Sequence, residues 1–155
     1  MLKNGKWVVT EPDLTISNKA KLFSMPTKAM YENEALSEIY EDYICEGHSL
    51  RYSGCFSLDL HQILIKRQGV YAMVNSVAYP SDLSLVFDMI PLAFLIEKAG
   101  GQASNGANNI LDVTINGSVD QRGTFVAGSS EDVQSIISKI WFFLTSNIKD
   151  LSFNI

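Results

Sequence analysis

The sequence predicts a single α/β domain in which helices cover both faces of a β-sheet. Short β-rich segments alternate with segments whose apolar residues recur at helical spacing, which is the pattern of such a layered arrangement. The chain has 155 residues, enough for one substantial hydrophobic core. Hydrophobic residues make up 46% of it and charged residues 19%, a composition typical of globular and not of disordered proteins.

The first third of the chain is expected to be extended and then helical. Residues 5–24 are predicted to contain extended segments with apolar anchors: Trp7, Val8, Val9, Leu22 and Phe23. An amphipathic helix is predicted over residues 32–45, where apolar side chains recur at helical spacing: Leu36, Ile39, Tyr40, Tyr43 and Ile44. Its other face carries acidic side chains, which we interpret as a solvated face and not as a metal site: Glu34, Glu38, Glu41 and Asp42.

A strand, a helix and a buried strand are predicted next. The strand covers residues 49–52, and the helix carries apolar side chains on one face: Phe56, Leu60, Ile63 and Leu64. Asp59 lies within this apolar helix, so we expect it to be buried and hydrogen-bonded. Gly69 is expected to end the helix in the left-handed conformation. Residues 70–74 are β-rich and predict a buried strand.

The segment 83–99 has helical spacing but contains Pro91. A proline in a helix interior costs about 3 kcal/mol, because it loses a hydrogen bond and clashes with the preceding turn. We therefore expect the regular helix to begin near Asp88, which leaves Pro91 in its first turn.

The last third is predicted to consist of short strands followed by a helix. Residues 102–128 contain two Asn-Gly hairpin signals, at 105–106 and 116–117. Ser129 and Asp132 have the spacing of a capping box. The helix after them has a clear apolar stripe: Val133, Ile136, Ile137, Ile140, Trp141 and Leu144.

Charge and local composition argue against several classes of partner. The net charge of −5 leaves no broad cationic face, so we expect no nucleic acid to bind, and an anionic ligand would need local cations or helix amides. No apolar run approaches the ~20 residues of a membrane helix, and the amino terminus lacks the apolar core of a signal peptide. The two cysteines and two histidines do not have the spacing of a metal site: Cys45, Cys55, His48 and His61. We therefore expect both cysteines to be reduced structural thiols in a cytosol-like compartment, and the sequence gives no support for a redox pair.

Three residues are candidates for function on spacing alone. Asp88 fits either the N-cap of a helix or a carboxylate offered to a hard cation such as Mg²⁺. Arg51 beside Tyr52 fits either a surface ion pair or a phosphate contact. The sequence holds no nucleophile–base pair and no GxSxG, P-loop or HExxH motif, so spacing alone indicates only an α/β domain.

Three motifs, taken together, resemble those of a known family. Residues 51–61 read RYSGCFSLDLH and resemble the Arg-Tyr-x-Gly-x-x-x-x-Asp-x-His segment of fructose-1,6-bisphosphatases and sedoheptulose-1,7-bisphosphatases. Residues 87–91 (FDMIP) and 94–101 (FLIEKAGG) resemble their aromatic-Glu-x-x-Pro helix and its Glu-x-Ala-Gly-Gly end. Residues 120–122 (DQR), followed by Gly128-Ser129, resemble their closing Arg…Gly-Ser strand.

The resemblance covers residues 5–140 in order and at near-gapless spacing. It is closer to the sedoheptulose enzymes, which the KLFS stretch at 21–24 and the length of the 69–88 connection both fit. At the position of the metal-binding Glu of the bisphosphatases this sequence has Asp88, and the related inositol monophosphatases also have Asp there.

This resemblance implies a fold, a reaction and three site residues. The fold is a three-layer α/β sandwich, the C-terminal lobe of the sugar-phosphatase fold, with residues 1–144 as that domain and 145–155 as a C-terminal tail. The reaction is Mg²⁺-dependent removal of the 1-phosphate of a sugar bisphosphate by metal-activated water. Asp88 would bind the metal, Tyr52 would contact the distal phosphate of the sugar, and Arg51 would reach the same phosphate in a neighbouring subunit.

The sequence also departs from the family pattern. Asp82 and Ser84 stand where the family has Lys and Arg, which reverses the local charge. Pro26 and Thr27 occupy the region of a substrate-contacting Asn, and Lys28 is either a substitute cation or an ordinary exposed lysine. The family's Asp-Pro-x-Asp-Gly motif, which supplies most metal ligands from the preceding lobe, has no equivalent beyond a Pro-Asp pair near the start.

One carboxylate cannot hold two Mg²⁺ ions, so we expect no turnover by this chain alone. Our leading hypothesis is the sugar-side half of a sedoheptulose-1,7- or fructose-1,6-bisphosphatase, partnered by an N-terminal catalytic lobe or a homo-oligomer. The alternatives are a non-catalytic paralogue that binds a partner subunit or a sugar phosphate, and a folded domain with no retained ligand. We expect the protein to be located in the cytoplasm, or in a plastid if an N-terminal portion is missing.

Overall fold

A five-stranded mixed sheet lies at the centre of the computed structural model, which describes residues 2–31, 33–77 and 79–151. Its strands are β3 (Leu22–Ser24), β4 (Ser49–Leu50), β5 (Val70–Met73), β6 (Gln102–Ser104) and β7 (Phe125–Gly128). Their order in the sheet is β4-β3-β5-β7-β6. β3 is parallel to β4 and β5, whereas β7 is antiparallel to β5 and β6.

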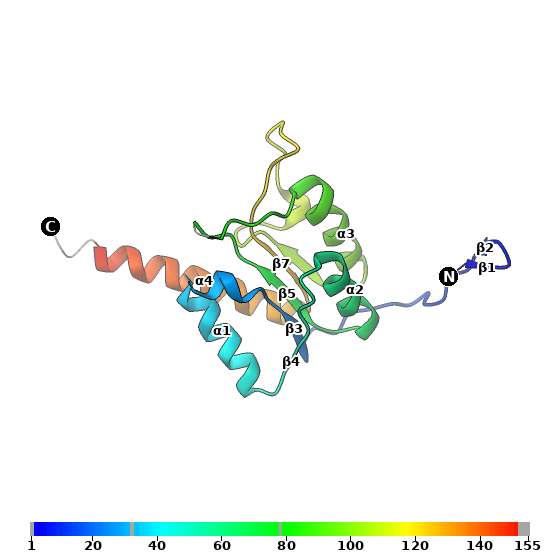
Figure 1. Ribbon diagram of the computed structural model, residues 1–155, viewed down its shortest axis with the longest axis horizontal. Helices are drawn as coiled ribbons and strands as arrows, with labels where there is room; N and C mark the ends of the chain where they lie inside the picture. Colours follow the sequence, from blue (N-terminus) through cyan, green and yellow to red (C-terminus); the bar gives the residue numbers. More distant parts are fainter. Residues whose placement is uncertain (1, 32, 78, 152–155) are drawn as a thin grey trace.

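Helices cover both faces of this sheet. The helices are α1 (Glu34–Cys45), α2 (Phe56–Lys66), α3 (Ile90–Lys98) and α4 (Ser130–Leu151), with short turns η1 (Thr27–Tyr31), η2 (Leu85–Met89) and η3 (Ile110–Asp112). Figure 1 shows α1 and α4 on one side of the sheet and α2 and α3 on the other. The three-layer α/β sandwich is therefore confirmed.

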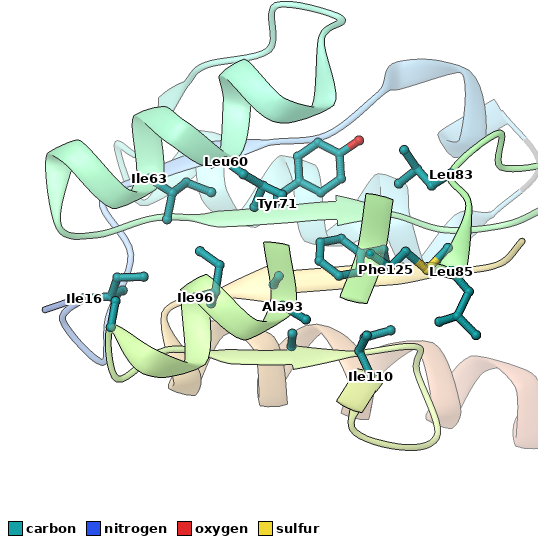
Figure 2. Close-up of a cluster of buried hydrophobic side chains, with 14 of the residues drawn as sticks. Ile16, Leu60, Ile63, Tyr71, Leu83, Leu85, Ala93, Ile96, Ile110 and Phe125 are labelled. Carbon is teal, nitrogen blue, oxygen red and sulfur yellow. The ribbon is translucent and has the colours of Figure 1, made fainter. Parts of the chain in front are cut away.

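The central strands are apolar because both of their faces are buried. Tyr71 and Phe125 pack into the core beneath α2 and α3 (Figure 2), whereas Val70 and Val126 belong to the core beneath α1 and α4. Successive strand residues point to opposite faces, so each central strand contributes to both cores. The second core confirms the predicted buried strand and most of the apolar stripes of the first and last helices, since it includes Leu36, Ile39, Tyr43, Val133, Ile136 and Ile140. Ile44 and Trp141 were predicted in these stripes but are exposed, and the side chain of Leu144 lies outside the described part of the structure.

The amino-terminal segment differs from its prediction. β1 (Leu2–Lys3) and β2 (Lys6–Trp7) form a separate antiparallel hairpin, which lies away from the sheet in Figure 1. The predicted anchors at its end are exposed, at 84% for Trp7, 44% for Val8 and 76% for Val9. The prediction that these three side chains anchor the segment in the core is therefore wrong, because a two-stranded hairpin has no second layer of its own to cover apolar side chains. Leu22 and Phe23, in the sheet, are buried as predicted.

The second helix does not end at Gly69. Its left-handed C-cap is Arg67, with φ of 56°. Gly69 has φ of 130°, and a Cβ there would collide with the side chain of Leu22. Gly128 lies opposite it, and a Cβ there would collide with the carbonyl oxygen of Gly69. Glycine is required at this point because two strands approach closely.

The predicted capping box before the last helix is also wrong. The Ser129 hydroxyl accepts a hydrogen bond from the N–H of Gly69 at 3.1 Å. The Asp132 carboxylate accepts from the N–H of Ala20 at 2.6 Å and from the Tyr43 hydroxyl at 2.9 Å. Both side chains therefore connect α4 to other elements instead of closing its own first turn.

The regular α3 begins at Ile90 with Pro91 in its first turn, close to the prediction. The π-helical turn η2 precedes it and has Ser84 as its N-cap. The turn at 105–106 is confirmed, since Ser104 and Asn109 pair across it. The turn at 116–117 lies in a segment without a named strand, so the second hairpin is wrong.

Three further features concern the helices. The acidic face of α1 is exposed, as predicted. Within residues 2–31, 33–77 and 79–151, no helix is both long enough and apolar enough to cross a membrane. α4 continues across residues 144 and 145, so the domain boundary predicted there does not coincide with a break in secondary structure.

Candidate functional site

A cavity of ≈ 840 Å³ opens at the carboxyl ends of β3, β4 and β5. These strands are parallel, so the segments that follow them meet at one edge of the sheet, where ligands of α/β proteins commonly bind. The first turn of α2 and the turn η2 close the other sides. The lining residues are Pro26, Lys28, Tyr52, Gly54, Cys55, Phe56, Ser57, Tyr71, Met73, Tyr79, Pro80, Asp82, Leu83, Phe87, Asp88 and Leu92.

Asp59 fixes the segment after β4. Its side chain is 1% exposed and accepts hydrogen bonds from the Ser24 hydroxyl and the Ser53 N–H, both at 3.0 Å. The expectation of a buried, hydrogen-bonded acid is confirmed. Because Ser53 adjoins Tyr52, this carboxylate holds the Tyr52 main chain at the cavity.

Two tyrosines present hydroxyl groups near acidic side chains. Burial raises the pKa of Tyr52, and the charges of Asp59 and Asp82 raise it further. Burial also raises the pKa of Tyr71, followed by the effects of Tyr52, Asp59 and Asp82. Both phenols therefore stay protonated at neutral pH and can donate hydrogen bonds.

Asp88 lies in η2 and is one of the residues that line the cavity. Its Oδ2 accepts from the Ser84 N–H at 2.8 Å, while the Ser84 hydroxyl accepts from the Phe87 N–H at 3.3 Å and donates to the Val119 carbonyl at 3.2 Å. The N-cap interpretation of Asp88 is therefore wrong, because Ser84 caps the turn. These contacts use one carboxylate oxygen of Asp88.

Arg51 is not among the lining residues, although its neighbour Tyr52 is. The Arg51 N–H donates to the Phe23 carbonyl at 2.8 Å, which makes the segment extended, and its guanidinium donates to the Leu50 carbonyl at 3.3 Å. Successive side chains of an extended segment point to opposite sides. The structure therefore brings Tyr52 and Asp88 to one cavity and leaves Arg51 on the exposed surface.

The chain matches the family model described as "Fructose-1-6-bisphosphatase, C-terminal domain" over residues 16–140. It belongs to the fructose-1,6-bisphosphatase family. It is 34% identical to chloroplastic sedoheptulose-1,7-bisphosphatase of Triticum aestivum over 134 residues, which is 86% of this chain and 34% of that enzyme. It is 37% identical to class 1 fructose-1,6-bisphosphatase of Nostoc punctiforme over 139 residues, 88% of this chain and 39% of that enzyme.

A crystal structure from Toxoplasma gondii, assigned to a sedoheptulose-1,7 bisphosphatase, superposes with a TM-score of 0.80 at 31% identity. It matches 83% of this chain and 40% of that one. The chain thus spans well under half the length of the family members that it matches.

We next tested whether the residues of the cavity could hold the metal ion that membership of the fructose-1,6-bisphosphatase family implies. Among residues 2–31, 33–77 and 79–151, no three acidic, His or Cys side chains lie close enough to hold an ion. Mg²⁺ requires six oxygen ligands in octahedral geometry. Asp88 could supply one ligand, but these residues do not form a complete magnesium site.

Sequence reasoning missed Cys55 as a lining residue. Both cysteines are free thiols, as expected, but both are exposed, so neither is packed in the core as a structural thiol would be. Cys55 is the N-cap of α2. Its contact of 3.5 Å with the Ser57 hydroxyl is the main cause that lowers the pKa of its thiol, and a hydrogen bond with the main chain at Leu58 lowers the pKa further. A cysteine between Gly54 and the first residue of a predicted helix is the signal that would have indicated an exposed thiol.

Proposed function

We propose that this chain forms the sugar-binding half of a Mg²⁺-dependent sugar bisphosphatase that acts on sedoheptulose-1,7- or fructose-1,6-bisphosphate. The observation that carries the proposal is the convergence of Tyr52 and Asp88 on one cavity at the carboxyl edge of the sheet. The family membership supports the same function. Most metal ligands would come from a second lobe, attached or separate.

Each site residue has a role that its geometry allows. Tyr52 stays protonated and would donate a hydrogen bond to the distal phosphate or a sugar oxygen. Asp88, oriented by the Ser84 N–H, would offer its other oxygen to Mg²⁺. Arg51, on the exposed surface, would act on a neighbouring subunit, which favours a homo-oligomer.

Bound magnesium would activate water and polarise the phosphoryl group that leaves the sugar. The residues of this chain would bind and orient the sugar, and they would exclude water with the aromatic lining of Phe56, Tyr71 and Phe87. We propose residues 1–144 as the domain, 145–155 as its tail, and a cytoplasmic or plastid location. The wheat relative is named as chloroplastic.

Phosphate release tests this function. Purified residues 1–155 with Mg²⁺ should release no phosphate from either bisphosphate, whereas addition of the amino-terminal lobe of a sugar bisphosphatase should restore turnover. Asp88→Asn should remove the restored activity, and Glu38→Gln, on the opposite face of the sheet, should retain it. Steady turnover by the isolated chain would show that no second lobe is needed.

A non-catalytic paralogue is the second candidate, and the acidic Asp82 in the cavity favours it. Such a protein would bind a partner subunit or a sugar phosphate without hydrolysing it. Binding of the bisphosphate by the two-lobe assembly, with no phosphate release in the presence of Mg²⁺, would distinguish it from the enzyme.

A further inference from the structure

The outer faces of α2 and α3 carry exposed apolar side chains, on the side away from the core. These side chains are Leu58 and Ile65 on α2 and Phe94 and Leu95 on α3. The inner faces of both helices belong to the core shown in Figure 2: Leu60, Ile63, Ala93 and Ile96. A helix that is apolar on both sides is typical of a buried layer, and exposed apolar patches on a globular protein mark interaction sites.

The helix layer on the other side of the sheet has the opposite character, since the exposed face of α1 is acidic. Within α2 and α3, which the structure describes completely, no acidic side chain is exposed. Asp59 is buried, and Glu97 is half-buried and accepts a hydrogen bond from the Asn109 side-chain amide at 2.5 Å. The charged side chains exposed within these two helices are Lys66 and Lys98. One helix layer therefore suits water, and the layer of α2 and α3 suits a covering partner.

The hairpin of β1 and β2 leaves the domain from this same layer. In the segment that follows it, Arg67, the C-cap of α2, forms an ion pair with Glu11 at 2.6 Å and donates to the Asp13 carbonyl at 3.1 Å. The Ile16 N–H donates to the carbonyl of Ala99, the C-cap of α3, at 2.7 Å. These contacts fix the base of the hairpin at the carboxyl ends of α2 and α3, and Figure 1 shows the hairpin extending beyond the domain.

The hairpin is a strand pair without a larger sheet. In the described part of the chain it pairs with no other strand, and both residues of its Asn4-Gly5 turn have positive φ, as a two-residue hairpin turn requires. Leu2 and Trp7 lie opposite each other across the two strands, so they share one face, and both are exposed. An isolated two-stranded hairpin is only marginally stable in water, and its open edges are templates for a further strand. The hairpin is therefore suited to join the edge of another sheet.

The relatives of this chain indicate what covers both surfaces. The chain matches a C-terminal domain and 39% of the length of the Nostoc punctiforme enzyme, so more than half of that enzyme has no counterpart in it. The hairpin lies outside the residues that the family model matches, which begin at residue 16. A second copy of this chain fits less well, because the exposed charges of β1, β2, α2 and α3 are all cationic and a symmetric contact would bring them together: Lys3, Lys6, Lys66 and Lys98.

We infer that the outer face of α2 and α3, together with the hairpin, is the docking surface for the amino-terminal lobe of a sugar bisphosphatase. The lobe covers the four exposed apolar side chains of the two helices, and an edge strand of its sheet pairs with the hairpin. The inference rests on the proposed function, in that a second lobe completes the enzyme. It adds the surface through which the two halves bind.

Two isoleucines provide a matched test of the docking face. Ile65 on α2 and Ile44 on α1 are both exposed, and each is the last residue but one of its helix, but the two helices lie on opposite sides of the sheet. The full chain is titrated with the amino-terminal lobe of the Nostoc punctiforme enzyme and followed by sedimentation velocity. Wild type and Ile44→Asp should form a one-to-one complex with equal affinity. Ile65→Asp should bind roughly tenfold more weakly, because its carboxylate is placed in an apolar contact.

Hydrogen exchange of the wild type tests the hairpin without any substitution. The main-chain amides of residues 2–7 should exchange about tenfold more slowly in the complex than in the free chain, because a strand of the lobe pairs with them. Unchanged exchange would refute the pairing of the hairpin.

Further results separate failure of this inference from failure of the proposed function. Equal binding by Ile65→Asp and Ile44→Asp, in a mixture that releases phosphate, overturns the docking face and leaves the proposed function standing. A complex that Ile65→Asp weakens, but that releases no phosphate from either bisphosphate with Mg²⁺, overturns the proposed function and leaves the docking face standing. A dimer of the chain alone that Ile65→Asp dissociates would assign the face to a second copy and overturn the assignment to the lobe. The absence of any complex with the wild type would overturn the docking surface as well.

Discussion

Asp59→Ala should destabilise the protein substantially and release the segment that carries Tyr52. The change removes the acceptor for the Ser24 hydroxyl and the Ser53 N–H, each at 3.0 Å, in a region where Asp59 is 1% exposed. The Ser24 hydroxyl is buried, so leaving it unsatisfied should cost about 2 kcal/mol, and loss of the partly buried bond from the Ser53 N–H should cost about 1 kcal/mol more. Together these give about 3 kcal/mol in the free energy of unfolding. With a urea m-value of about 2 kcal/mol/M, the unfolding midpoint should fall by about 1.5 M.

Urea unfolding followed by fluorescence measures this loss, and amide hydrogen exchange locates it. The Ser53 N–H should lose protection in Asp59→Ala, because its acceptor is gone. Asp120→Ala removes an exposed acid and should stay within about 0.5 kcal/mol of the wild type. An unchanged midpoint, or a Ser53 amide as protected as before, would show that this carboxylate does not hold the segment.

Three further outcomes are expected. Gly128→Ala should cost more than about 3 kcal/mol in urea unfolding, because the methyl group meets a main-chain carbonyl across the sheet, whereas Gly117→Ala, with open space around it, should cost about 1 kcal/mol. Burial and, after it, the hydrogen-bonded Asp132 carboxylate raise the pKa of Tyr43 above its ordinary value of 10.0. The folded state therefore keeps a proton that the unfolded state loses, and the free energy of unfolding should fall as the pH rises past about 10. Tyr43→Phe should lose less stability than the wild type over that pH range, and equal losses would refute the assignment. At pH 7, iodoacetamide should modify Cys55 faster than Cys45, and equal rates would contradict the lowered pKa of Cys55.

The layers of the fold could be predicted because each element shows its burial in its own sequence. The stripes of α1 and α4 have helical spacing, and β5 is apolar throughout because both faces are buried. Apolar character alone failed at Trp7, because spacing does not show whether a second layer covers a hairpin.

Polar contacts were harder to predict, since their partners are distant in the sequence. Asp132 bonds to Ala20, 112 positions away, so its capping-box spacing was misleading. The sequence indicated Ser84 only as a neutral residue at a position where the family has a cation, but Ser84 caps η2 and orients Asp88. The separation of Arg51 from the cavity follows from strand geometry, which depends on knowing that residue 51 pairs with β3.

The central claim, that this chain provides only part of a metal site, is tested most directly by counting bound ions. Mn²⁺, a spectroscopic substitute for Mg²⁺, can be titrated into residues 1–155 and followed by electron paramagnetic resonance, with Asp88→Asn as the control. We predict at most one weakly bound ion, lost in that variant. Two tightly bound ions in the wild-type chain alone would contradict the claim.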